Sequence, residues 1–90
     1  MGKLTKEDII LLFLEDPYKL ANEIWKENVP KSDEIRILLC ELGDPDCAYY
    51  YALGIDKKPT DETRTVACKD PYCDCLYAVY VDKKNSGRNL

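Results

Sequence analysis

Histidine is absent from this 90-residue chain, and Phe, Trp and Met occur once each. Without histidine, the usual base that activates a cysteine or serine nucleophile is missing. The five cysteines include no Cys-x-x-Cys pair, and this argues against a tetrahedral zinc site. We therefore expect no enzyme, no catalytic residue, no metal and no cofactor.

Positive charge and long apolar runs are also scarce. A net charge of −4 and a pI near 4.8 argue against nucleic acid or an anionic membrane as partner, because affinity for phosphate depends on clustered Lys and Arg. No apolar run approaches the ~20 residues that span a bilayer, and no signal peptide is apparent at the start. An odd number of cysteines favours reduced thiols. We expect one domain with a cytoplasmic location.

What the chain does contain is an internal repeat. DPDCAYYYALGIDKK at 44–58 returns as DPYCDCLYAVYVDKK at 70–84, and the pattern DExRxxxC occurs at 33–40 and again at 61–68. An older, diverged copy precedes them. A fixed period of this length indicates stacked structural units. The predicted units cover residues 5–31, 32–58 and 60–84, and a tail covers 85–90.

Each unit is predicted to be a hairpin of two short helices. Good N-cap residues open all six helices: Thr5, Asp16, Ser32, Asp44, Thr60 and Asp70. Each Asp is followed by Pro, which suits the first helical position, and Gly43 suits a left-handed helix end. With apolar residues at helical spacing, we expect helices over 6–15, 17–28, 33–42, 45–55, 61–69 and 71–82. The fold class is all-α, either a short right-handed solenoid or a compact bundle of three helical hairpins.

The patterns DExRxxxC and DPxxAxxYA, with Leu42-Gly43-Asp44-Pro45 between helices, resemble the short HEAT-like class of helical repeats. The chain resembles more closely the short Asp-Pro, Tyr-Ala and Asp-Lys-Lys repeats that occur in arrays in phage and uncharacterised microbial proteins. The resemblance covers about residues 32–84, and the first copy departs from it by lacking the Arg, the Cys and the Tyr-Ala pair. It implies scaffolding and partner binding, as in a phage or mobile-element accessory protein, and transfers no catalytic residue.

The cysteines occupy matching places in the repeat. Cys40 corresponds to Cys68, and Cys47 corresponds to Cys73. Cysteine at equivalent positions indicates a small buried side chain at helix contacts. Metal binding is the alternative that these positions leave open.

Arg36 and Arg64 are also repeat-equivalent. We expect each to pair with a carboxylate, Asp44 or Asp70, and to fix the packing between units. A role in binding a ligand is the alternative.

Tyrosine is the most informative surface signal, with seven residues in the chain. Three consecutive tyrosines at 49–51 are spread around a helix by about 100° per residue, so they cannot all face one core. Tyrosine is enriched at protein–protein hot spots. The alternative is that Tyr51 and Tyr77 belong to the core between units and the other tyrosines form only an amphipathic rim. The predicted binding residues are Tyr49, Tyr50, Tyr72, Val79 and Tyr80.

Two functions fit these observations. The first is a non-catalytic helical-repeat module that binds a protein partner or a second copy of itself. The second is an acidic inhibitor or decoy that blocks a nucleic-acid-binding or host-defence protein. The lysines after Asp56 and Asp82 weaken the second, because each Asp-Lys-Lys is expected to neutralise itself.

The ends of a stack must be covered. The first unit carries polar residues suited to a cap: Lys19, Asn22, Glu23 and Lys26. The last helix stays apolar at Cys75, Leu76, Tyr77, Val79, Tyr80 and Val81. We therefore expect a homodimer through the C-terminal repeat, with Val79 and Tyr80 near its two-fold axis.

Overall fold

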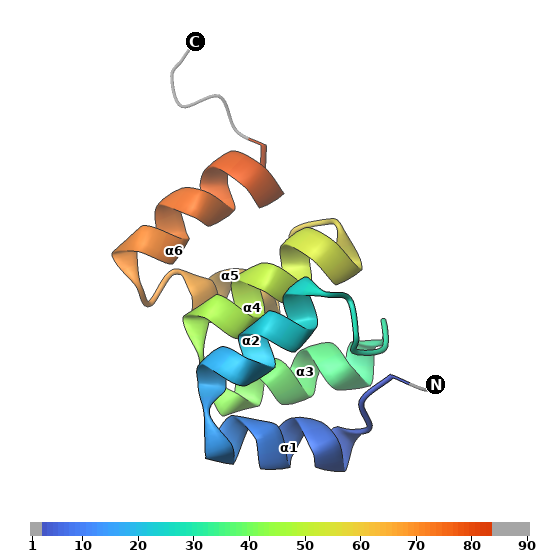
Figure 1. Ribbon diagram of the computed structural model, residues 1–90. Helices are drawn as coiled ribbons and strands as arrows, with labels where there is room; N and C mark the ends of the chain where they lie inside the picture. Colours follow the sequence, from blue (N-terminus) through green and yellow to red (C-terminus); the bar gives the residue numbers. More distant parts are fainter. Residues whose placement is uncertain (1–2, 84–90) are drawn as a thin grey trace, which may run out of the picture.

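The computed structural model describes residues 3–83, and every regular element in this range is helical (Figure 1). The elements are α1 (Lys6–Glu15), α2 (Pro17–Trp25), α3 (Asp33–Leu42), α4 (Pro45–Tyr50), η1 (Tyr51–Asp56), α5 (Asp61–Ala67), α6 (Pro71–Leu76) and η2 (Tyr77–Val81). The predicted all-α fold is confirmed. No helix in 3–83 has the length and apolar character to cross a membrane. The predicted tail, 85–90, lies outside the described residues.

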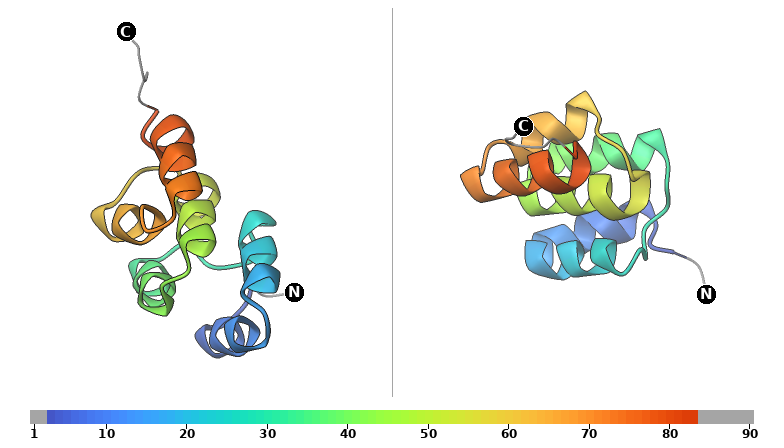
Figure 2. Two further views of the ribbon diagram at one scale, coloured as in Figure 1. Left: turned by 90° about the vertical axis from the view of Figure 1, so that its left-hand side faces the viewer. Right: turned by 90° about the horizontal axis from the view of Figure 1, so that it is seen from above.

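The helices form two layers, which Figure 2 shows from the side. The A helices, α1, α3 and α5, form one layer. The B helices, α2, α4 with η1, and α6 with η2, form the other. Each B helix follows its A helix after a very short turn, so the chain runs as three successive hairpins.

All six predicted N-caps are present. Each cap side chain accepts a hydrogen bond from a backbone N–H in the first turn of its helix, and Thr5 forms a full capping box with Asp8. Such caps satisfy donors that the helix itself cannot pair. The predicted left-handed end at Gly43 is also present, with φ of 82°.

The number of residues between a B-helix side chain and its N-cap Asp determines which of two core clusters the side chain packs in. Cys47 and Tyr51, three and seven positions after Asp44, pack in a cluster with α1, α2 and α3. Tyr49 and Ala52, on the other side of the same helix, pack in a second cluster with α5 and α6. Because α4 and η1 contribute to both clusters, the middle B helix joins the first hairpin to the last.

The second and third B helices end in π-helical turns, which the helical periodicity did not predict. A π turn closes a hydrogen bond from residue i to i+5, as Asp82 N–H does to the Tyr77 carbonyl at 2.9 Å. The wider turn brings residue i+5 closer to the face of residue i than a straight α-helix does, in which the two lie about 140° apart around the axis. The turn therefore aligns Tyr51 with Asp56, and Tyr77 with Asp82, on the face toward the A helices.

The aligned tyrosines hold the hairpins closed. The Tyr51 hydroxyl accepts from Ser32 N–H at 3.0 Å and donates to the Pro30 carbonyl at 2.8 Å. The Tyr77 hydroxyl likewise accepts from Thr60 N–H at 3.1 Å. Each tyrosine thus ties the middle of a B helix to the N-cap of the A helix in the same hairpin.

The two arginines pair with Asp56 and Asp82, and not with the predicted partners Asp44 and Asp70. Arg36 contacts Asp56 at 3.3 Å, and Arg64 pairs with Asp82. The side chains of Asp44 and Asp70 instead accept backbone N–H groups as N-caps. Both arginines form salt bridges, as expected. The predicted partners were wrong because the prediction assumed straight α-helices, which would not direct Asp56 and Asp82 toward the arginines.

Candidate functional site

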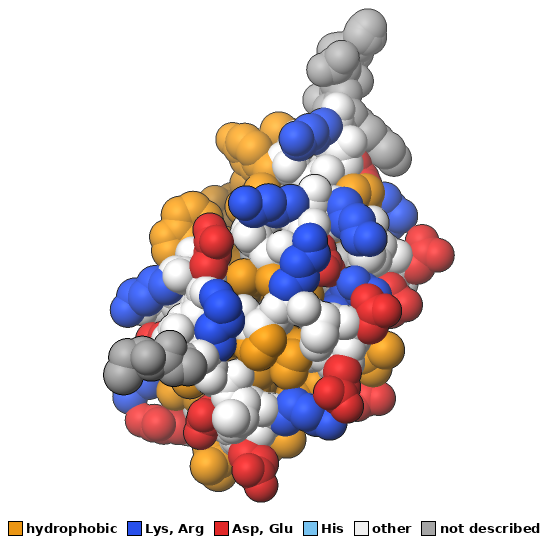
Figure 3. Space-filling view, turned by 90° about the vertical axis from the view of Figure 1, so that its right-hand side faces the viewer, with side chains coloured by type: hydrophobic (Ala, Val, Ile, Leu, Met, Phe, Trp, Pro, Cys, Tyr) orange, Lys and Arg blue, Asp and Glu red, His pale blue; other side chains and the backbone are white. Residues whose placement is uncertain are grey.

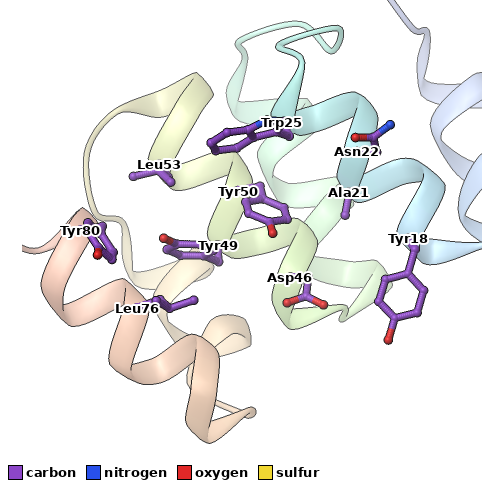
Figure 4. A pocket seen from close by; sticks show the side chains of 10 residues that line it. All are labelled: Tyr18, Ala21, Asn22, Trp25, Asp46, Tyr49, Tyr50, Leu53, Leu76 and Tyr80. Atoms are coloured by element: carbon purple, nitrogen blue, oxygen red, sulfur yellow. The ribbon is translucent and has the colours of Figure 1, made fainter.

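The B helices together form an open groove with a volume of about 650 Å³ (Figure 4). Ten side chains line it: Tyr18, Ala21, Asn22, Trp25, Asp46, Tyr49, Tyr50, Leu53, Leu76 and Tyr80. Five of these are aromatic, although only nine aromatic residues occur in the whole chain. We call this surface the B-helix groove.

The repeat register places these side chains on one face. Residues two, six and nine positions after the N-cap Asp avoid the core positions described above and look outward. They are Tyr18, Asn22 and Trp25 in the first unit, Asp46, Tyr50 and Leu53 in the second, and Tyr72, Leu76 and Val79 in the third. Seven of these nine residues line the groove, and the exceptions are Tyr72 and Val79. Stacking three copies of the same helix side by side therefore accounts for most of the lining.

Aromatic rings pack on one another at the centre of the groove. The ring centroids of Trp25 and Tyr50 lie 5.7 Å apart at 59°, and those of Tyr49 and Tyr50 lie 5.3 Å apart at 45°. Such tilted pairs are the favoured arrangement of aromatic rings. The walls remain accessible, because Trp25 is 61% exposed and Tyr80 is 53% exposed. The groove thus combines a fixed aromatic floor with open aromatic walls.

Among the groove residues, Asp46 is the sole acidic one, and no Lys or Arg lines the groove within the described residues. Its Oδ1 atom accepts a hydrogen bond from the Cys73 thiol at 3.0 Å. Burial raises the pKa of both Tyr49 and Tyr50, with a smaller contribution from Asp46 to the latter. The tyrosines therefore keep their hydroxyl protons at neutral pH and can donate hydrogen bonds to a ligand.

The predicted binding residues divide between the groove and its margin. Tyr49, Tyr50 and Tyr80 line the groove, and Tyr49 is buried, so it forms floor rather than exposed surface. Tyr72 and Val79 are exposed but do not line the groove. Three of the five predicted residues therefore lie together in the groove, and their role in binding stays a prediction.

Sequence reasoning missed Tyr18, Trp25 and Asp46. They lie in the same register as the predicted residues but in other copies of the repeat. Aligning the second, sixth and ninth positions of all three units would have found them. The diverged first copy was treated as a cap, and this concealed its aromatic side chains.

The N-terminal end of the stack is not the polar cap that we predicted. On α1, Leu11 is 65% exposed and Leu14 is 74% exposed. The prediction considered the second helix of that unit alone and overlooked the outer face of the first. At the other end, Tyr77 and Val81 turn into the core, which leaves a smaller apolar surface than expected.

The predicted packing role is confirmed for one repeat-equivalent pair of cysteines, Cys47 and Cys73, and is wrong for the other, because Cys40 is only partly buried and Cys68 is exposed. Cys47 and Cys73 are buried in the two core clusters. Burial raises the pKa of both thiols, and the pKa of Cys40 rises to about 11 for the same reason. Thiols with raised pKa values are poor nucleophiles. In the part of the chain that the structure describes, no group of three or more His, Cys, Asp or Glu residues is placed to hold a metal ion.

The lysines after the B helices are not neutralised by their neighbours, contrary to prediction. Asp56 and Asp82 are committed to the two arginines, and Lys57, Lys58 and Lys83 form no ion pair within residues 3–83. Lys84 lies outside the described residues. Figure 3 views the side on which the B helices end, where Lys and Arg side chains are spread over the face with Asp and Glu side chains among them.

Comparison with models of protein families, with curated proteins and with solved structures finds no match to this chain in any of the three.

Proposed function

We propose that this chain is a non-catalytic protein-binding module, and that the B-helix groove holds a segment of a partner protein. The observation that carries the proposal is the aromatic lining of an open groove formed by three helices. Tyr and Trp supply large contact area at low entropic cost, and they dominate protein–protein hot spots.

The shape of the groove favours a polypeptide over a small molecule. Small-molecule sites surround most of their ligand. Here Tyr18 and Trp25 are both more than half exposed, so an occupant would be covered on one side only. An extended chain can use such a surface along its length, with alternate side chains turned toward the aromatic floor.

The same residues argue against catalysis in the groove. Asp46 is its one carboxylate, and the nearest thiol, Cys73, is buried with a raised pKa. General acid–base chemistry needs titrating groups whose pKa values lie near the operating pH. The acidic decoy is also less favoured than binding of a segment, because free lysines follow two of the B helices.

A peptide-display selection tests the proposal. A random library is selected on the wild-type protein and then measured on Trp25→Glu and Tyr80→Glu, which place charge in the groove at exposed positions. Leu11→Glu, at an exposed position on α1 in the other layer, is the matched control. We expect the groove variants to lose at least about tenfold in affinity and the control to keep it. Peptides that bind all four proteins equally would disprove the proposal.

A further inference from the structure

An acidic side chain, Asp46, lies at one end of the B-helix groove, and two lysines lie just beyond the other end. Figure 4 shows Asp46 near Tyr18, at the end where the B helices begin, and Trp25, Leu53 and Tyr80 toward the end where they finish. A smaller hollow of about 190 Å³ adjoins the groove there. It shares Leu53 and Tyr80 with the groove and is lined also by Ala52, Lys57, Val81 and Lys83.

Asp46 is a carboxylate that is able to bind a cationic group of a ligand. One of its oxygens is bound by the Cys73 thiol, and no lysine or arginine of residues 3–83 pairs with it. Tyr18 and Tyr50 lie near it in the groove (Figure 4), and the face of an aromatic ring attracts a cation. An arginine side chain suits this setting best, because its planar guanidinium stacks on aromatic rings and pairs with a carboxylate at the same time.

Lys57 and Lys83 are two ammonium groups that are able to bind an anionic group of a ligand. Both are exposed, both follow a B helix at the same repeat position, and both have left-handed backbones with φ of 57° and 58°. The carboxylates next to them in sequence are turned inward to Arg36 and Arg64. The two ammonium groups therefore have no competing partner among the described residues.

The separation of the two ends sets the spacing on a ligand. Asp46 lies in α4 and Lys57 directly follows η1, 11 residues later, which corresponds to about 16 Å along a helix. An extended peptide covers that length in about five residues.

We infer that the occupant of the groove is an extended segment of a partner protein that carries an arginine or lysine against Asp46. The same segment carries an acidic residue four or five positions away, against Lys57 and Lys83. This inference rests on the proposed function, because it specifies the charge pattern of the segment that the groove binds. An acidic protein with a net charge of −4 would also attract the basic end of such a segment from solution.

Charge reversal at each end of the groove tests the inference. Random peptides are selected in parallel on wild type, on Asp46→Lys and on Lys57→Glu/Lys83→Glu. We expect wild type to enrich a basic and an acidic residue at that spacing. Asp46→Lys should replace the basic residue by an acidic one, and the double variant should replace the acidic residue by a basic one. Glu7→Lys, an equal charge change on α1, should enrich the wild-type pattern.

A second measurement guards against misfolding of the charge-reversed proteins. For a peptide selected on wild type, replacing its arginine by citrulline should weaken binding at least about tenfold. On Asp46→Asn, which keeps the shape of the side chain, the same replacement should have little effect. Peptides that lose binding on Trp25→Glu but show no charge preference would overturn the inference and leave the proposed function intact. Failure to obtain any groove-dependent peptide would overturn both.

Discussion

Tyr51 and Tyr77, each seven positions after the N-cap Asp of its helix, have two structural roles in their hairpins. Each ring fills the core, since Tyr51 and Tyr77 are at most 1% exposed. Each hydroxyl reaches the N-cap of the A helix. A polar group at this depth is tolerated only because it is hydrogen-bonded. Tyr51 and Tyr77 therefore belong to the core, and their hydrogen-bonded hydroxyls favour tyrosine over phenylalanine at these positions.

Tyr51→Phe should destabilise the fold by about 1 to 3 kcal/mol, because Ser32 N–H loses its acceptor in a partly buried place. Urea unfolding followed by circular dichroism measures the change. Tyr18→Phe is the control, since its side chain is 76% exposed, and it should change stability by less than about 0.5 kcal/mol. Equal stability of both variants would contradict the role assigned to the hydroxyl.

The thiols should differ sharply in reactivity. Cys75 is exposed and should be alkylated first at pH 8. Cys68 should react more slowly, because its hydrogen bond to Asp74 raises its pKa. Since the thiolate is the reactive form, the rate at Cys40 should rise about tenfold per pH unit up to about pH 11. Mass spectrometry of iodoacetamide-treated protein resolves the sites. Buried thiols that react as fast as Cys75 would contradict their place in the core.

Among the elements, the middle B helix determines how the hairpins combine. It belongs to both core clusters, so neither neighbour can bury its apolar face without it. This explains why three tyrosines follow one another there: Tyr49 faces one cluster, Tyr51 faces the other, and Tyr50 lies between them at the groove. A helix at the end of the stack has only one such face to bury.

Two glycines offer a matched test of these elements. Gly43 ends α3 with φ of 82°, while Gly54 lies within η1, and a Cβ atom would meet nothing within 4 Å at either. Gly43→Ala should therefore cost about 1 kcal/mol through left-handed strain alone. Gly54→Ala should instead stabilise by about 0.5 to 1 kcal/mol, because alanine loses less backbone entropy. Thermal or urea unfolding measures both, and shifts of the same sign would contradict these backbone assignments.

Most of the helices could be predicted from the sequence, because the N-caps and the repeat spacing depend only on residues close together in the chain. The N-caps and the end at Gly43 required nothing beyond neighbouring residues. The π turns could not be found in that way. Their signal is the pair Tyr51 and Asp56, five residues apart and repeated in the last unit, and its meaning depends on an arginine in another helix. For the same reason the arginine partners were predicted wrongly.

At the scale of the whole molecule, the two ends of the stack differ from the middle. α1 exposes Leu11 and Leu14, and the last B helix exposes Tyr72 and Val79. Repeat proteins need such ends to be covered. The homodimer through the C-terminal repeat stays a prediction, and it now has a competing surface at the opposite end.

Sedimentation at micromolar concentration distinguishes these surfaces. If the dimer forms through the C-terminal repeat, Val79→Lys should give a monomer, because a charge at the interface is costly to bury. Leu14→Lys should leave the dimer unchanged. Val79 is the better choice for this test because Tyr80 also lines the groove. A dimer that survives Val79→Lys and is lost with Leu14→Lys would contradict the prediction.

The candidate site could be predicted only in part, because a groove is a property of the stack rather than of one unit. Tyr50 was predicted from composition and helical geometry, and Tyr80 was predicted from the apolar C-terminal end of the stack. Trp25 was missed, since nothing in its own hairpin indicates that it would face Tyr50 of the next. Asp46 likewise lies near an aromatic residue of the neighbouring unit, Tyr18. Such relations follow from the repeat only once the three units are stacked in register.

The most direct test of the groove as a binding site uses Trp25, the single tryptophan of the chain. A peptide selected on the wild-type protein is titrated while the fluorescence of Trp25 and its quenching by acrylamide are recorded. Because Trp25 is 61% exposed in the groove wall, we expect a blue shift and protection from quenching at the concentrations that saturate binding. Saturable binding that leaves the emission and quenching of Trp25 unchanged would show that the partner segment lies elsewhere.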